Sequence, residues 1–307
     1  MEITHLRIAT RKSQLALWQT HFIQQQLQKL YPTLQIERVE ITSTGDKIQD
    51  KPLADIGGKA LFVKALEEAL QENRADIAVH SLKDVPADLE SEFTIAAVTA
   101  RANPFDALLS RDYADLDALP QGAKVGTCSP RRQAQLLAYR PDLQMLSLRG
   151  NVDSRVKKCL QGEYDAIVLA CAGLERLGLQ GHIRQAIPDM LMLPAAGQGV
   201  VGIECLSKRT DLIELLNPLN HAETHAAITA ERSMVLELRG NCHSAIGAYA
   251  HVHHQILHLS ALVSDPNGTT VIRTRQQGLV LDPTRVGQRA AEALLQQGAK
   301  NLLKNKM

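Results

Sequence analysis

The sequence predicts an α/β protein with mixed, mostly parallel sheets, followed by a small α+β segment. Up to about residue 205, short apolar strands alternate with helices that carry one apolar face, which is typical of parallel βαβ units. From about residue 219 the order changes to one helix, three strands and a final helix. A length of 307 residues is enough for two or three domains with cores of their own.

The first block is expected to contain strands at residues 6–10, 36–41, 75–79 and 93–98. A helix follows the first strand through about residue 30, because Leu15, Trp18 and Phe22 are spaced to share one face. A second helix opens at Gly57-Gly58-Lys59, where the glycines permit close approach of the backbone to a ligand.

The second block repeats this order, with strands expected at residues 124–126, 146–148 and 165–170. The small-residue segment 194–199 then suits a crossover, and we expect strand 200–205 to return to the first sheet. The predicted division is residues 1–99 with 200–218 as domain 1, 100–199 as an inserted domain 2, and 219–307 as domain 3.

The third block predicts a three-stranded antiparallel sheet at residues 245–251, 256–263 and 269–275. Asn267-Gly268 suits the last hairpin turn, because these residues readily take positive φ. Helices are expected at about 222–238 and 284–297.

The composition argues against several classes of protein. The net charge is +1 and aromatic residues make up 3% of the chain, which disfavours a nucleic-acid or membrane partner. Five widely spaced cysteines without a CxxC pair, and no apolar run of signal or membrane length, predict a cytoplasmic protein with reduced thiols. Cys128, Cys159, Cys171 and Cys205 are expected to be small buried apolar residues.

Cations follow most of the predicted strands. Arg11, Lys83, Arg131 with Arg132, and Arg149 lie in the turns, and Lys59, Arg155 and Arg176 open or lie early in neighbouring helices. The carboxyl ends of strands form the ligand crevice in open α/β sheets, and such cations bind carboxylates and phosphates. The sequence therefore predicts a cleft for a polyanionic ligand.

Two residues stand out for chemistry. Asp84 ends the stretch AVHSLKDVP and should be ionised in a basic cleft, ready to stabilise a cation or accept a proton. Cys242 lies in a turn between Gly240 and His243, where neighbouring cations favour its thiolate as a nucleophile or attachment point. The histidines near residue 253 have no cysteine or carboxylate to complete a ligand set, so no metal site is expected.

Together, nine segments resemble hydroxymethylbilane synthase, also called porphobilinogen deaminase, over essentially the whole chain. They are RIATRKSQLALWQ from Arg7, STGDKI from Ser43, GGKALFVKALEEAL from Gly57, ADIAVHSLKDVP from Ala75, GTCSPRRQAQL from Gly126, LRGNVDSR from Leu148, DAIVLACAGLERLG from Asp165, LPAAGQGVVGIEC from Leu193 and GNC from Gly240. The order of the segments makes the resemblance specific.

The resemblance implies that the first two domains are built like type II periplasmic binding proteins. It implies a dipyrromethane cofactor in thioether linkage to Cys242, onto which four porphobilinogens are joined head to tail with loss of ammonia. Hydrolysis then releases linear hydroxymethylbilane. It further implies a monomer that can hand its product to uroporphyrinogen-III synthase.

The resemblance also implies residue roles, with Asp84 as the catalytic group that stabilises cationic intermediates. The cofactor-binding residues would be Cys242, Lys59, Ser81, Lys83, Asp84, Thr127, Ser129, Arg131, Arg132 and Arg155. The substrate-binding residues would be Arg11, Ser13, Phe62, Arg149, Arg155 and Arg176.

Departures from the family pattern include Ala60, Asn241 and Ala245, which bear on the geometry of the loop around Cys242. None of them removes a charge from the cleft. Two alternatives stay open. One is a non-enzymatic clamp for polycarboxylates, and the weaker one is a thiol hydrolase that uses Cys242 and His243.

Overall fold

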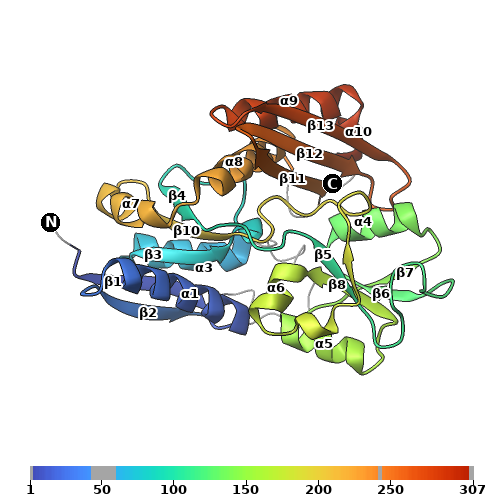
Figure 1. Ribbon diagram of the computed structural model, residues 1–307, viewed down its shortest axis with the longest axis horizontal. Helices are drawn as coiled ribbons and strands as arrows, with labels where there is room; N and C mark the ends of the chain where they lie inside the picture. Colours follow the sequence, from blue (N-terminus) through green and yellow to red (C-terminus); the bar gives the residue numbers. More distant parts are fainter. Residues whose placement is uncertain (1–2, 43–59, 241–243, 304–307) are drawn as a thin grey trace. The chain divides into compact units, whose positions relative to one another are not determined.

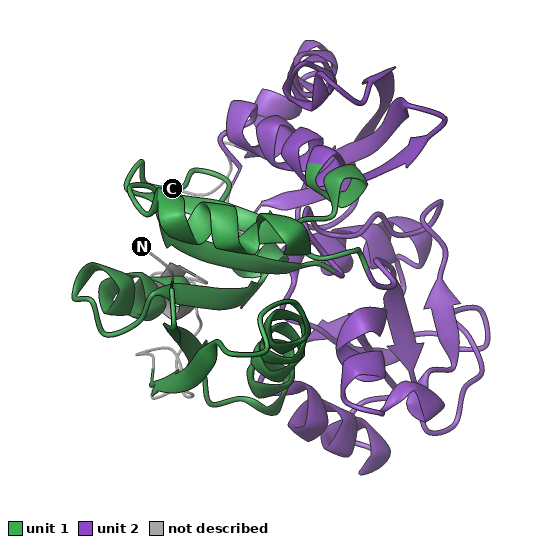
Figure 2. Ribbon diagram, turned by 60° about the vertical axis from the view of Figure 1, so that its left-hand side comes forward, with its two compact units in different colours: residues 1–101, 200–225 green, residues 102–199, 226–307 purple. Residues whose placement is uncertain are grey.

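The computed structural model describes residues 3–42, 60–240 and 244–303, with side chains from residue 63 onward in the segment that begins at 60 (Figure 1). The chain divides into two compact units, which Figure 2 shows in different colours. Unit 1 comprises residues 1–101 and 200–225, and unit 2 comprises residues 102–199 and 226–307.

Unit 1 is built on a five-stranded mixed sheet with the order β2-β1-β3-β10-β4. Its strands are β1 (His5–Arg11), β2 (Gln35–Ile41), β3 (Ile77–Ser81), β4 (Phe93–Val98) and β10 (Val201–Leu206). The strands β2, β1 and β3 run parallel, and β10 lies antiparallel between β3 and β4. The strand expected at residues 200–205 therefore does return to the first sheet, whereas the three-domain division stays a prediction.

Helices cover both faces of this sheet. On one face, Ile23 and Leu27 of α1 (Gln14–Leu30) and Leu212 of α7 (Thr210–Leu216) pack in one core with Ile8 and Ile203. On the other face lies α3 (Ala60–Gln71), whose Leu66 and Leu70 pack with Ala9 and Ala78 in a second core. The stripe predicted for this helix, Leu15, Trp18 and Phe22, is not its buried face: Trp18 is 36% exposed and stacks on the half-buried Phe22, and the buried face is made by other residues of the helix.

Unit 2 contains a second five-stranded mixed sheet with the order β7-β6-β8-β5-β9. Its strands are β5 (Asp106–Leu109), β6 (Lys124–Gly126), β7 (Gln144–Leu146), β8 (Ala166–Ala170) and β9 (Gln185–Ile187). The first three in the sheet order run parallel, and β5 is antiparallel to both β8 and β9. The sequence did not predict β5 or β9, because each is only three or four residues long and lacks alternation.

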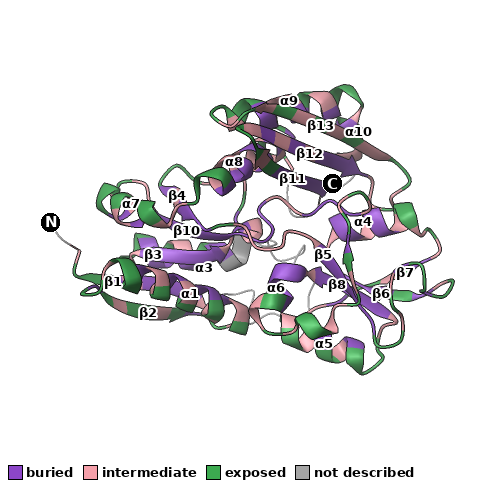
Figure 3. Cartoon of the chain, viewed as in Figure 1, coloured by how far each residue is buried: buried purple, intermediate pink, exposed green. Residues whose placement is uncertain are grey.

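The helices of the second sheet again divide between its faces. Leu136 of α4 (Pro130–Tyr139) packs with Val125 and Val168 on one face. On the other face, α5 (Val152–Leu160) and α6 (Cys171–Arg176) bury Val156 and Leu174 against Ile167. Figure 3 shows the buried strands of both sheets beneath partly exposed helices.

The C-terminal part of unit 2 is an antiparallel meander of β11 (Ala245–His253), β12 (Ile256–Ser264) and β13 (Val271–Leu279). Apolar residues of α8 (Ala222–Glu237), α9 (Pro283–Gln296) and α10 (Ala299–Leu303) pack on one face of it. No helix among the described residues is both long enough and apolar enough to cross a membrane.

A buried carboxylate joins this C-terminal part to the segment that precedes β10. The two carboxylate oxygens of Glu231, on α8, accept hydrogen bonds from the backbone N–H groups of Gly197 at 2.8 Å and Ala250 at 2.7 Å. Gly268, in the turn between β12 and β13, lies close to the backbone of Ala134 in α4 and has a φ of +71°. Helix α4 therefore packs both on its own sheet and against the C-terminal meander.

The contact at Gly268 yields a stability prediction. The G268A variant should lose about 1–3 kcal/mol of unfolding free energy, because the new Cβ meets a backbone carbonyl in addition to the strain of positive φ. G178A is the matched control, since Gly178 has a φ of +70° and open space around it. Chemical denaturation of both variants measures the difference, and equal losses would contradict a tight contact with α4.

Candidate functional site

One edge of the first sheet gathers five of the predicted site residues. The parallel register pairs Ala9 with Ala78, so β1 ends at Arg11 and β3 at Ser81 on the same edge. Ser13 caps the amino terminus of α1 and accepts a hydrogen bond from the Ala16 N–H at 3.3 Å. Directly after β3, the single turn η2 (Leu82–Asp84) carries Lys83 and Asp84.

The turn that carries Lys83 and Asp84 is anchored at each end. The side-chain amide of Gln19 donates to the Ser81 hydroxyl at 2.7 Å, and the Leu82 N–H donates to the Val200 carbonyl at 3.0 Å. Leu82 is buried, and its side chain occupies the space left by the missing side chain of Gly202. The two charged residues therefore extend from a buried backbone, which fixes where they point.

The carboxyl edge of the second sheet gathers the predicted residues of unit 2. Thr127 follows β6, Arg149 follows β7, and α6 with Arg176 follows β8. Helix α4 begins after Ser129, and α5 carries Arg155, whose Nε donates to the Gly150 carbonyl at 2.6 Å. Each sheet thus presents cations and hydroxyls at its carboxyl edge, as the sequence predicted.

Arg176 is held by the backbone of Gly199, the last residue of the 102–199 segment. Its Nη2 donates to the Gly199 carbonyl at 2.8 Å. Burial lowers the pKa of Arg176 to about 10, so the guanidinium stays charged near neutral pH. A partly desolvated cation attracts a carboxylate more strongly than one in water.

Arg131 and Arg132 are arranged in a way that the sequence did not predict. Both side chains are buried and share the carboxylate of Asp106, the first residue of β5. Arg131 Nη1 lies 2.7 Å from Asp106 Oδ2, and Arg132 contacts Oδ1 through Nε at 3.0 Å and Nη2 at 2.7 Å. Further donors reach the carbonyls of Leu193 and Val168.

The charges in this group depend on one another. Burial alone would raise the pKa of Asp106, but the charges and hydrogen bonds of Arg131 and Arg132 outweigh it and hold that pKa well below its usual range. Burial lowers the pKa of Arg131, which Asp106 opposes. Two guanidiniums around one carboxylate leave one net positive charge on this buried group.

Two residues of this group were missed from the sequence. Asp106 begins a four-residue strand, and Gln198 donates to its Oδ1 at 3.0 Å and to the Pro104 carbonyl at 2.7 Å. A signal was available, because an aspartate at the head of the apolar run DALL needs a cationic partner when it is buried. In the described residues, Arg131 Nε is buried and has no hydrogen-bond partner.

Some predicted residues fall outside what the structure describes. Lys59 and Cys242 lie outside the described residues, as does the side chain of Phe62. Cys159, Cys171 and Cys205 are buried as expected, but Cys128 is exposed. Its Sγ contacts the Ser147 hydroxyl at 3.2 Å and the Leu148 carbonyl at 3.0 Å.

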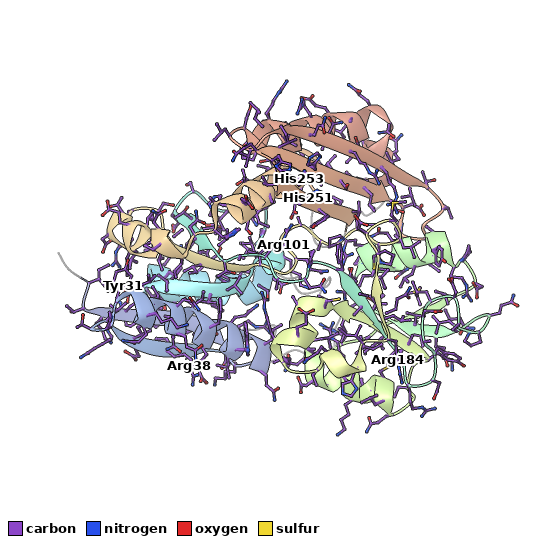
Figure 4. All side chains as sticks on the ribbon, in the orientation of Figure 1. Tyr31, Arg38, Arg101, Arg184, His251 and His253 are labelled. Carbon is purple, nitrogen blue, oxygen red and sulfur yellow. The ribbon has the colours of Figure 1, made fainter. Side chains whose placement is uncertain are left out.

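The histidines of the meander form ring contacts. Figure 4 labels His251 and His253 on β11. The rings of His251 and His258 face each other across β11 and β12 at 5.2 Å, whereas His253 contacts His254 at 4.1 Å. No group of three or more histidine, cysteine, aspartate or glutamate side chains in the described part of the chain could hold a metal ion.

Comparison with protein families matches nearly the whole chain. Residues 6–214 match the model described as "Porphobilinogen deaminase, dipyromethane cofactor binding domain", and residues 225–296 match "Porphobilinogen deaminase, C-terminal domain". The chain belongs to the porphobilinogen deaminase family. Porphobilinogen deaminases are transferases of tetrapyrrole biosynthesis, and their cofactor is dipyrromethane.

Solved structures similar to this porphobilinogen deaminase family member include periplasmic binding domains. The periplasmic domain of BvgS from B. pertussis has 16% identity and a TM-score of 0.42, covering 70% of this chain and 39% of that chain. The aliphatic sulphonate binding protein SsuA from Escherichia coli has 15% identity and a TM-score of 0.38, covering 78% of this chain and 71% of that chain. At such low identity these names carry no information about the ligand.

The Asp106 group yields the second prediction. D106A should destabilise the protein by about 3–5 kcal/mol, because it leaves two buried guanidiniums without their carboxylate. D112A is the control, since it removes an exposed pair with Arg111 and should leave the unfolding midpoint unchanged. Denaturant unfolding of the two variants measures this, and similar midpoints would contradict the structural role of Asp106.

Proposed function

We propose that this porphobilinogen deaminase joins four porphobilinogens head to tail on a dipyrromethane primer attached to Cys242, and releases linear hydroxymethylbilane by hydrolysis. The observation that carries the proposal is the Lys83–Asp84 turn, which is held at the exit of a buried strand and shares a sheet edge with Arg11. The proposal includes a monomer of three domains that hands its product to uroporphyrinogen-III synthase.

The residues present fit a cofactor that bears carboxylates. The donor set at the two sheet edges consists of cations and hydroxyls, and a buried donor, Arg131 Nε, has no partner among the described residues. Those that would hold the cofactor are Lys59, Ser81, Lys83, Thr127, Ser129, Arg131, Arg132 and Arg155. When bound, dipyrromethane supplies the pyrrole carbon that accepts the first porphobilinogen.

Asp84 would act on the substrate through its charge. Loss of ammonia from porphobilinogen leaves positive charge on the pyrrole, and a carboxylate fixed beside the pyrrole nitrogen stabilises that charge as it develops. Because Asp84 follows a buried anchor at Leu82, little reorganisation is needed during the reaction.

The cations would hold the acetate and propionate groups of the pyrroles. Arg11 and Ser13 lie at the amino terminus of α1, where free backbone N–H groups also favour an anion. In unit 2, the Asp106 group has a net positive charge. Together with Arg149 and Arg176, it would bind the carboxylates of the growing pyrrole chain. Phe62 would add an apolar contact.

Intact-mass spectrometry tests the cofactor assignment. The purified chain should exceed its sequence mass by one dipyrromethane, and C242S should show the bare sequence mass, because a hydroxyl is a far weaker nucleophile than a thiolate. C128S is the matched control, since it removes the exposed thiol of Cys128 and should keep the added mass. An unmodified parent chain that still makes hydroxymethylbilane would refute the assignment.

The role of Asp84 predicts a separate result. D84N should retain the cofactor mass but release ammonia from porphobilinogen roughly 10²–10³-fold more slowly, because a neutral amide stabilises a cation poorly. D88N changes an exposed aspartate four residues further along and should turn over normally. A normal rate for D84N would show that the assigned role is wrong, and a parent chain that releases no ammonia would favour the non-enzymatic clamp.

A further inference from the structure

A buried acid–base pair lies next to the Lys83–Asp84 turn and is not needed to explain substrate binding. His80 of β3 and Glu204 of β10 lie on the same face of the first sheet, since the antiparallel register pairs His80 with Gly202 and Glu204 with Ala78. His80 Nε2 lies 2.8 Å from Glu204 Oε2, with the two side chains 6% and 0% exposed. Among the described residues, the other oxygen, Oε1, has no hydrogen-bond partner.

This pair joins the returning strand to the strand that leads into the turn. One residue, Ser81, separates His80 from η2, and the Leu82 side chain packs over Gly202, the residue opposite His80. A buried carboxylate that loses its only side-chain partner is strongly destabilising. The pair therefore favours a single placement of β3 against β10 at the point where the chain turns toward Asp84.

A second carboxylate, Glu67, lies on the helix that packs over β3 and β10. It lies on α3, which covers this face of the sheet through Leu66 and Leu70. The charges that act on Glu67 come from Glu204 and His80 beneath it, from Glu90, and from Lys64 on its own helix. Among the described elements, β1 and η2 also pack against α3, and their charged residues at this end are Arg11, Lys83 and Asp84.

The environment of Glu67 keeps it protonated at unusually high pH. Burial, followed by the negative charge of Glu204, raises the pKa of Glu67 to about 7, while His80 and Lys64 act in the opposite direction. Ionised Glu67, on the helix that packs over this face of the sheet, would add a second negative charge to the field of Glu204. Since like charges in a partly desolvated site repel, ionisation opposes the arrangement that the pair maintains.

We propose that His80 and Glu204 are positioning residues for the Lys83–Asp84 turn, and that ionisation of Glu67 weakens their hold. The inference rests on the proposed function, because it concerns how Asp84 is presented to the substrate. Neither His80 nor Glu204 touches the substrate in this proposal. They act through Leu82, by fixing the backbone from which Asp84 extends.

The first experiment compares E204Q with the exposed control E68Q, both assayed for ammonia release with porphobilinogen. E204Q should keep the cofactor mass and a KM within about twofold of the parent, but lose roughly tenfold or more in kcat, because displacement of a catalytic group by even about 1 Å is costly. In the double variant H80Q/E204Q a neutral amide pair can re-form the hydrogen bond, so kcat should recover in part relative to H80Q alone.

The second experiment tests Glu67. The ratio of kcat for E67Q to that of the parent should rise from near unity at about pH 6 to roughly threefold at about pH 8, while the same ratio for E68Q stays flat.

Thermal unfolding of E67Q and the parent provides an independent readout. The raised pKa gives the parent a stabilisation that is fully present below the ordinary pKa of 4.5 and is lost as pH rises through about 7. E67Q should therefore have a higher melting temperature than the parent at about pH 8, and the same melting temperature at about pH 4.5.

These outcomes separate the two proposals. A parent chain that converts no porphobilinogen refutes the proposed function. An active parent with E204Q at parental kcat, or with E67Q and parent pH profiles that coincide, refutes the positioning role alone. If E204Q does not fold, as judged by circular dichroism, the pH profile of E67Q decides.

Discussion

The carboxylate of Asp106 is buried between the guanidiniums of Arg131 and Arg132, and unit 2 depends on this arrangement. It ties the start of β5 to the first turn of α4, and the remaining donors reach the carbonyls of Leu193 and Val168. Removing the carboxylate would leave two buried guanidiniums without a counter-charge. The same group leaves one net positive charge close to the edge where a carboxylate ligand is expected.

Each unit contains a buried polar group close to the carboxyl edge of its sheet, but the residues differ. Each must hold charged side chains at the carboxyl edge of a sheet without exposing the backbone that carries them. Unit 2 has the buried ion group of Asp106 near this edge, whereas unit 1 has the buried pair of His80 and Glu204 beneath α3. In both, the buried polar side chains are hydrogen-bonded to partners from other strands or helices, so tertiary structure contributes to the position of the edge.

Local pattern predicted much of this architecture. Alternating strands and helices gave both sheets, their parallel segments and the cations at their carboxyl ends, because those features follow from hydrophobic period and chain order. The pattern missed β5 and β9, which are too short to show a period. Because β5 was missed, Asp106 was not identified as the partner of Arg131 and Arg132. The Asp106 group and the pair of His80 and Glu204 join residues distant in sequence, and no spacing rule identifies such pairs. Cys128 was expected to be buried because most free cysteines are, but its side chain is exposed.

The place of β10 in the first sheet has a consequence for how the chain folds. This strand lies between β3 and β4 and hydrogen-bonds to both, yet in the sequence it follows the whole 102–199 segment. During synthesis from the amino terminus, the first sheet therefore lacks an internal strand until the second sheet has left the ribosome. Pairing over such a separation is slow because the intervening chain must be closed into a loop. The second sheet is thus complete first, and the edges of β3 and β4 stay unpaired in nascent chains that end before residue 201.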